Sequence, residues 1–153
     1  VIQTGSGDVE VHGVASLHVN SGSGDLKLSG IKGAVQVQTG SGDLVADDLG
    51  SLEVASAGSG DLHVNNVHGD AHVDQIGSGD ATFGDVSGTV KVDDAGAGDI
   101  NAHHVGGNVE IGSIGSGDVD AVDVGGNFSV HSNGSGDINH SNVKGKVDVP
   151  DDH

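Results

Sequence analysis

The sequence predicts an all-β fold: a single-stranded parallel β-helix, or β-solenoid, of about eight coils of 17–19 residues. Three observations lead to this prediction. A short glycine-rich motif recurs eight times, apolar residues alternate in step with the motif, and no stretch keeps the period of a helix. We expect residues 1–153 to form a single domain of such repeats.

The recurring motif is Gly-Ser-Gly-Asp, in which Ala97 once replaces the serine. Its aspartates follow one another at intervals of 17, 18, 18, 19, 19, 19 and 19 residues: Asp8, Asp25, Asp43, Asp61, Asp80, Asp99, Asp118 and Asp137. One motif therefore corresponds to one coil.

Five apolar columns accompany the motif. Three lie one, three and six residues after each aspartate, and two more, spaced by two, follow a turn whose length varies by one residue. Of the 40 column positions 39 are apolar, and only His140 breaks the pattern. Spacing by two residues, with valine dominant, indicates strands with one buried face. Each coil should hold one strand directly after the aspartate and a second strand after the variable turn.

The turn between these two strands also contains a glycine in seven coils: Gly33, Gly50, Gly69, Gly88, Gly107, Gly126 and Gly145. A unit this short cannot bury its own apolar face, so we expect successive units to stack about 4.8 Å apart, strand upon strand. The general preference for right-handed parallel crossovers favours a right-handed coil.

The composition excludes several classes of function. Five lysines and no arginine stand against 23 acidic residues, and the net charge of −18 argues against nucleic acid as a partner. No apolar run approaches the roughly 20 residues of a membrane helix, so we expect no membrane insertion. The absence of cysteine removes disulfides and thiolate metal sites.

Enzymatic activity is not expected either. A polysaccharide-acting enzyme is the form it would take on a β-helix. However, no long loop interrupts the repeats to form a cleft, and the chain has no Arg, Tyr or Trp to hold a sugar. We therefore predict no catalytic residues.

The eight motif aspartates are the candidate site residues, with two interpretations. In the structural one, the glycines adopt positive φ, small residues let the turns stack, and each carboxylate accepts hydrogen bonds from the N–H groups of its own turn, as in an Asx turn. In the alternative, calcium ions offset the repulsion within the file of carboxylates, as in the calcium-binding Gly-Gly-x-Gly-x-Asp repeat. In this chain Asp follows Gly directly, and the opposite turn has no acidic residue at a regular position. Calcium takes six to eight oxygen ligands, so one carboxylate per coil would have to be supplemented by other oxygens. We therefore expect no cofactor, with a calcium ladder as the alternative.

The ten histidines do not suggest a zinc site. His18 and His72 share an outward column but are three coils apart, so we expect solvated surface side chains. His140 occupies an inward column in the last coil, where we expect a polar residue at the end of the core.

The repeated Gly-Ser-Gly-Asp, preceded by Ser21 in the second coil and followed by alternating apolar residues, and the closing Val147-Asp148-Val149-Pro150, resemble bacterial adhesin-like domains of unknown function, including those named for auto-transporter adhesin heads. The resemblance spans essentially the whole chain. It implies a right-handed parallel β-helix exported to the periplasm, the cell surface or the extracellular space, with a role in adhesion. It brings no catalytic residues.

The ends of the solenoid suggest self-association. Ile2-Gln3-Thr4 matches Val37-Gln38-Thr39, so we expect the chain to begin within a coil, with either upstream sequence removed or another molecule covering that end. Pro150 and the charged residues 151–153 would cap the other end. We expect a non-catalytic, exported, structural or adhesin-like solenoid, a cell-surface or matrix component that stacks end to end into a fibre. The alternative from another class is a calcium-binding module that uses the aspartates.

Overall fold

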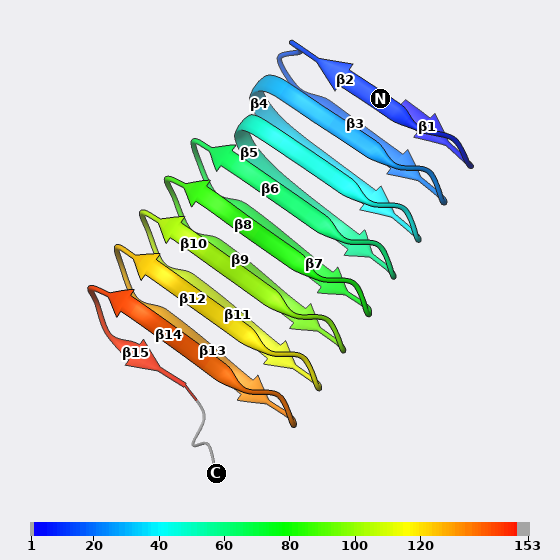
Figure 1. Ribbon diagram of the computed structural model, residues 1–153. Helices are drawn as coiled ribbons and strands as arrows, with labels where there is room; N and C mark the ends of the chain where they lie inside the picture. Colours follow the sequence, from blue (N-terminus) through cyan, green and yellow to red (C-terminus); the bar gives the residue numbers. More distant parts are fainter. Residues whose placement is uncertain (1, 150–153) are drawn as a thin grey trace.

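The computed structural model describes residues 2–149, and every element in this range is a strand (Figure 1). The strands are β1 (Ile2–Thr4), β2 (Val9–His12), β3 (Leu17–Ser21), β4 (Leu26–Thr39), β5 (Leu44–Ala57), β6 (Leu62–Val67), β7 (Ala71–Ile76), β8 (Ala81–Val86), β9 (Val90–Ala95), β10 (Ile100–Val105), β11 (Val109–Ile114), β12 (Val119–Val124), β13 (Phe128–Asn133), β14 (Ile138–Val143) and β15 (Val147–Asp148). No helix that is long and apolar enough to span a membrane occurs among these residues.

The strands form two parallel stacks that lie against each other, which confirms the predicted β-solenoid (Figure 1). One stack contains β2, β6, β8, β10, β12 and β14, and the other contains β1, β3, β7, β9, β11, β13 and β15. The 14-residue strands β4 and β5 run through both stacks. Within residues 2–149 the first stack therefore has eight layers, one for each motif.

The pairing register follows the repeat. Ile100, one residue after its motif aspartate, pairs with Ala81 on one side and with Val119 on the other. Because equivalent residues pair from coil to coil, the five predicted columns lie inside the molecule. Phe83 and Phe128, the largest side chains of the core, are both 0% exposed.

A sixth inward column was not predicted. It is the residue directly before each motif, and its buried members are Ser21, Thr39, Ala57, Ile76, Ala95 and Ile114. The column was missed because its first buried members are polar, whereas the predicted columns were identified by their apolar residues. The hydroxyls of Ser21 and Thr39 are buried without a hydrogen-bond partner among the described residues.

The core is incompletely covered only at the two ends of the rod, as far as the described residues show. The partly buried apolar side chains are Ile2, Val9, Val11 and Val14 in the first coil, and Ile138, Val143 and Val149 in the last. His140 lies in the inward column as expected but is exposed, with its ring 6.0 Å from that of Phe128. The predicted cap at Pro150 and residues 151–153 lies outside the described residues.

The expectation that the motif glycines need positive φ is wrong for nearly all of them. Among the motif glycines in residues 2–149, only Gly7 has a φ in this region, 123°. Glycine is needed at these positions for a different reason, which is steric: a Cβ on Gly79 would overlap the carbonyl oxygen of Gly60 in the preceding coil. Close stacking of the turns therefore requires glycine here.

Positive φ occurs instead at a bend five residues after each motif aspartate. Gly13 and Gly30 occupy it with φ of 64° and 65°, and the six later coils place a non-glycine residue there with φ between 52° and 59°: Asp48, Asn66, Asp85, His104, Asp123 and Asn142. Asn and Asp are the non-glycine residues that most readily adopt this left-handed conformation. The bend turns the chain between the second and third inward columns of each coil.

Candidate functional site

The eight motif aspartates form a hydrogen-bonded ladder along one edge of the rod. Oδ1 of each aspartate from Asp8 to Asp118 accepts a hydrogen bond from the backbone N–H of the aspartate in the next coil, at 2.9–3.2 Å. In each such pair of aspartates, the residue directly after the first aspartate donates its backbone N–H to the carbonyl oxygen of the second, at 2.7–2.8 Å. Each of these carboxylates therefore joins two coils, whereas the structural interpretation expected it to accept N–H groups of its own turn.

The opposite turn contains a similar ladder that sequence reasoning missed. Asp70 Oδ1 accepts the N–H of Thr89 at 2.9 Å, and Asn108 Oδ1 accepts the N–H of Asn127 at 2.8 Å. Thr89 Oγ1 and Asn127 Oδ1 accept the equivalent N–H groups at 3.4 and 2.9 Å. The signal in the sequence is the polar residue after each turn glycine from Gly69 onward. Since neutral side chains make this contact as well, the contact does not require a charge.

The aspartate ladder does not gather three carboxylates around one point. Among residues 2–149, the one group of three His, Asp or Glu ligand atoms that all lie within 4.8 Å of one another is His72, Asp74 and Asp93. A calcium ion on the ladder would need to draw most of its six to eight oxygens from backbone carbonyls, serine hydroxyls or water. The hydrogen bonds of the ladder thus link adjacent coils directly, without an ion between them.

The cluster of His72, Asp74 and Asp93 lies on the outer face of the β7 and β9 layer. His72 Nε2 is 3.0 Å from Asp74 Oδ1 and 3.3 Å from Asp93 Oδ2. The three side chains are 36%, 46% and 50% exposed, respectively. His72 lies on the outer face as predicted, but its spacing from the other histidines gave no sign of the acids beside it on its own strand and in the next coil.

Other histidines pair with one carboxylate each. His68 Nε2 is 2.9 Å from Asp48 Oδ1, and His12 Nε2 is 2.9 Å from Glu10 Oε1. The hydrogen bond with His12 and the positive charge of its ring lower the pKa of the Glu10 carboxyl. These pairs are exposed, so each is a surface contact that salt screens.

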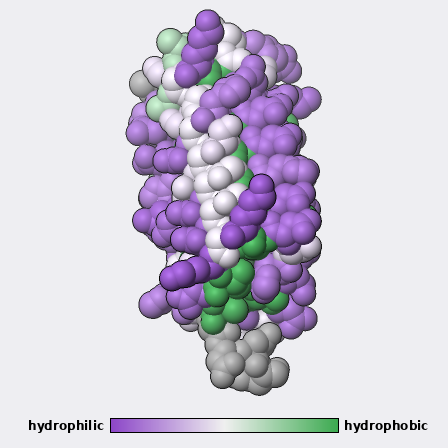
Figure 2. Space-filling model, turned by 90° about the vertical axis from the view of Figure 1, so that its left-hand side faces the viewer, coloured by the Kyte–Doolittle hydropathy of each residue, from purple (hydrophilic) through white to green (hydrophobic). Residues whose placement is uncertain are grey.

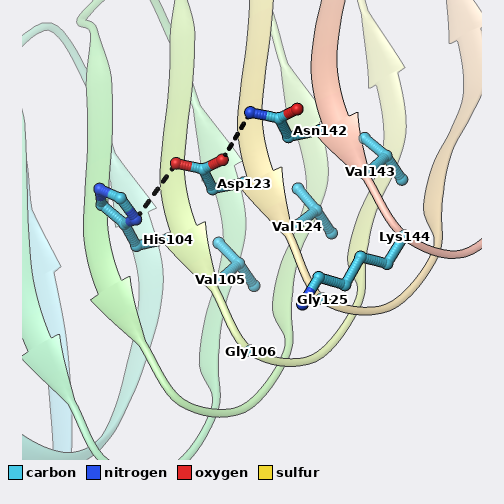
Figure 3. Close-up of a pocket in the computed structure, with 9 residues that line it drawn as sticks. All are labelled: His104, Val105, Gly106, Asp123, Val124, Gly125, Asn142, Val143 and Lys144. Carbon is cyan, nitrogen blue, oxygen red and sulfur yellow. Dashed lines mark hydrogen bonds and ion pairs between the residues drawn. The ribbon is translucent and has the colours of Figure 1, made fainter.

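A groove of about 550 Å³ lies beside the left-handed bend near the C-terminal end of the rod (Figure 3). Asp123 accepts a hydrogen bond from Asn142 Nδ2 at 2.9 Å and lies 3.3 Å from His104 Nδ1, so three successive bend residues are linked. Beneath them Val105, Val124 and Val143 follow one another from coil to coil, as the register requires.

A band of small residues follows this edge of the rod. Figure 2 shows a band of near-neutral residues that runs along the rod between hydrophilic flanks, with hydrophobic residues toward the end that carries the C-terminus. The turns along this edge contain Gly69, Gly88, Gly107 and Gly126, and a Cβ on each would overlap the preceding coil. Close stacking of the turns therefore accounts for the narrow, small-residue surface.

Comparison with models of protein families, with curated proteins and with solved structures finds no match for this chain.

Proposed function

We propose that the chain is a non-catalytic structural rod, an exported and adhesin-like β-solenoid that extends end to end into a fibre at the cell surface. The observation that carries the proposal is that the recurring residues of the repeat are used to stack coils. Glycines admit the neighbouring turn, aspartates link adjacent coils, and the apolar columns fill one continuous core. A repeat devoted to stacking favours a structural role over a catalytic one.

The two ends of the rod support its extension. Within residues 2–149, β1 and β2 at one end and β14 and β15 at the other each pair with a single strand (Figure 1). The inward apolar residues of these end coils are only partly covered, and Val147 is 38% exposed. A further coil would complete the hydrogen bonds of the end strands and bury these side chains.

A second copy of the chain fits this position. The inward columns of the last coil recur in the first coil, where the turn between the third and fourth columns is one residue shorter, so each strand of the first coil of one copy can continue the last coil of another in register. In that arrangement Asp137 would accept the N–H of Asp8 from the next copy, as the seven preceding motif aspartates accept the N–H of the next aspartate within the chain.

Export and adhesion rest on the resemblance to bacterial adhesin-like domains. A thin rod suits such a role, because it separates its two ends by several tens of ångströms using few residues. A cysteine-free chain also needs no oxidative step after export.

The fibre is tested by the mass of the purified chain as a function of concentration, measured by light scattering after size exclusion, with electron microscopy of the same samples. We expect assemblies that lengthen with concentration. Val147→Asp should shorten them by placing a charge on the end face. Val45→Asp is the matched control, because Val45 is also 38% exposed but faces outward in the interior of the rod. Monomers at every concentration, or equal effects of the two substitutions, would contradict end-to-end stacking.

A further inference from the structure

We propose that His72, Asp74 and Asp93 form a binding site for a divalent first-row transition metal ion such as Zn²⁺. The inference is independent of the fibre proposal. It concerns the outer face in the interior of the rod, away from both ends.

The fold brings the three side chains together in a simple way. His72 and Asp74 are two residues apart in β7, so both point outward from the same strand face. In the next coil, Val92 pairs with Val73 and Asp94 pairs with Gln75, which places Asp93 beside Asp74. The site therefore spans two adjacent coils and depends on the register between them.

The distances suit ligands of one ion. Zinc binds imidazole nitrogen at about 2.0–2.1 Å and carboxylate oxygen at about 2.0–2.2 Å, so tetrahedral ligand atoms on one ion lie roughly 3.3–3.5 Å apart. His72 Nε2 lies 3.0 and 3.3 Å from the two carboxylate oxygens, and all three ligand atoms fall within 4.8 Å of one another. A metal ion would replace the Nε2 proton between the carboxylates, after a movement of about 1 Å by exposed side chains.

The charges around the site favour a dication. Two carboxylates face one imidazole, and Glu53 and Lys91 are the backbone-pairing neighbours of His72 in the two adjacent coils. Even with Lys91 present, the acids predominate, and the chain as a whole carries −18. The mixed nitrogen and oxygen ligands favour zinc and its neighbours in the first transition row over calcium, which takes oxygen ligands only.

The remaining coordination positions face solvent. Three protein ligands leave at least one position on a four-coordinate ion for water or for a ligand from another molecule. Other histidines pair with a single carboxylate, such as His68 with Asp48 and His12 with Glu10. Each of these pairs offers only two ligands, one imidazole and one carboxylate. They should bind the same ion more weakly.

The test is calorimetric titration of ZnCl₂ into chelator-treated full-length chain at neutral pH. We expect one site per chain that is clearly tighter than the rest, and a loss of affinity of about tenfold or more in His72→Gln and in Asp93→Asn. His18→Gln is the matched control, because His18 shares the outward column of His72 but pairs with no carboxylate among the described residues. Its affinity should remain that of the parent.

Imidazole ¹⁵N chemical shifts give a second readout. Substoichiometric Zn²⁺ should move the ring nitrogens of His72 before those of the other histidines. Because all three side chains are partly exposed, the variants should keep the melting temperature of the metal-free parent within a few degrees. Absence of a tight site, or a tight site that His72→Gln leaves unchanged, would overturn the proposal.

Discussion

Gly77 is constrained by the coil that precedes it rather than by its own backbone conformation. A Cβ at this position would approach the carbonyl oxygen of Gly58 more closely than real Cβ atoms do, and that oxygen belongs to the rigid turn of the neighbouring layer. Gly5 occupies the same place in the motif of the first coil, where an added Cβ would meet nothing within 4 Å. The same residue type in the same motif therefore has different tolerance at the two positions.

Gly77→Ala should lower the free energy of unfolding by about 1–3 kcal/mol, because the turn must move to accept the methyl group. Gly5→Ala should change it by no more than about 0.5 kcal/mol. Urea unfolding followed by circular dichroism compares the two variants with the parent. Equal losses would show that alanine is disfavoured for a reason other than stacking.

At the scale of the strands and turns, the side-chain ladders on both edges connect each coil to the next. Asp80 Oδ1 accepts the N–H of Asp99 at 3.1 Å, and in the opposite turn Asn108 makes the same contact with Asn127. The contact requires an acceptor oxygen, whereas the charge adds repulsion between neighbouring carboxylates. The opposite turn therefore shows that neutral side chains can form such a ladder.

Asp80→Asn should leave stability unchanged or raise it slightly, since it keeps an acceptor oxygen and removes one charge from the file. Asp80→Ala should lower stability by about 0.5–1.5 kcal/mol through the lost hydrogen bond. Thermal melts at neutral pH distinguish the variants. If Asp80→Asn is as destabilising as Asp80→Ala, the charge itself has a role, as it would in a cation ladder.

Calcium provides a direct test of that alternative. If the aspartates serve stacking alone, the melting temperature should be the same in millimolar calcium as in chelator, once the ionic strength is matched with sodium chloride. An ion bound to the folded ladder would raise the melting temperature in proportion to the logarithm of its excess over the dissociation constant. Such a rise, lost in Asp80→Asn, would favour the calcium-binding function.

At the scale of the whole molecule, a net charge of −18 is distributed over a thin rod. Most acidic side chains are exposed, so their mutual repulsion extends over about one Debye length, roughly 10 Å at 0.1 M salt and about 30 Å at 0.01 M. Since coils lie about 4.8 Å apart, each acid is within range of acids in several neighbouring coils at low salt.

The melting temperature should therefore rise by several degrees between about 10 mM and about 150 mM sodium chloride, because screening weakens the repulsion within the folded rod. Differential scanning calorimetry at neutral pH measures this rise. Choline chloride is the control, since a bulky monovalent cation should screen equally well. An effect limited to one cation would indicate specific binding instead of screening.

Part of the fold could be predicted from the sequence and part could not, as particular residues illustrate. The column that includes Val64 and Phe83 was predicted, because alternation with a period of two residues indicates a buried strand face from local sequence alone. The left-handed bend was open to prediction from its Gly, Asp and Asn content, although His104 and the lack of an apolar signature made it inconspicuous. The column that begins with Ser21 was hidden, because its first members are polar.

The sequence by itself determined the coil length, the two strands of each coil and most of the buried columns, because these follow from spacings along the chain. Only the tertiary structure decided which groups meet between coils: the carbonyl oxygen that excludes a Cβ at Gly79, the N–H that each motif aspartate receives, and Asp93 beside His72. These contacts depend on the register and side-chain directions of adjacent layers, to within about an ångström, and a repeat period does not specify positions that finely.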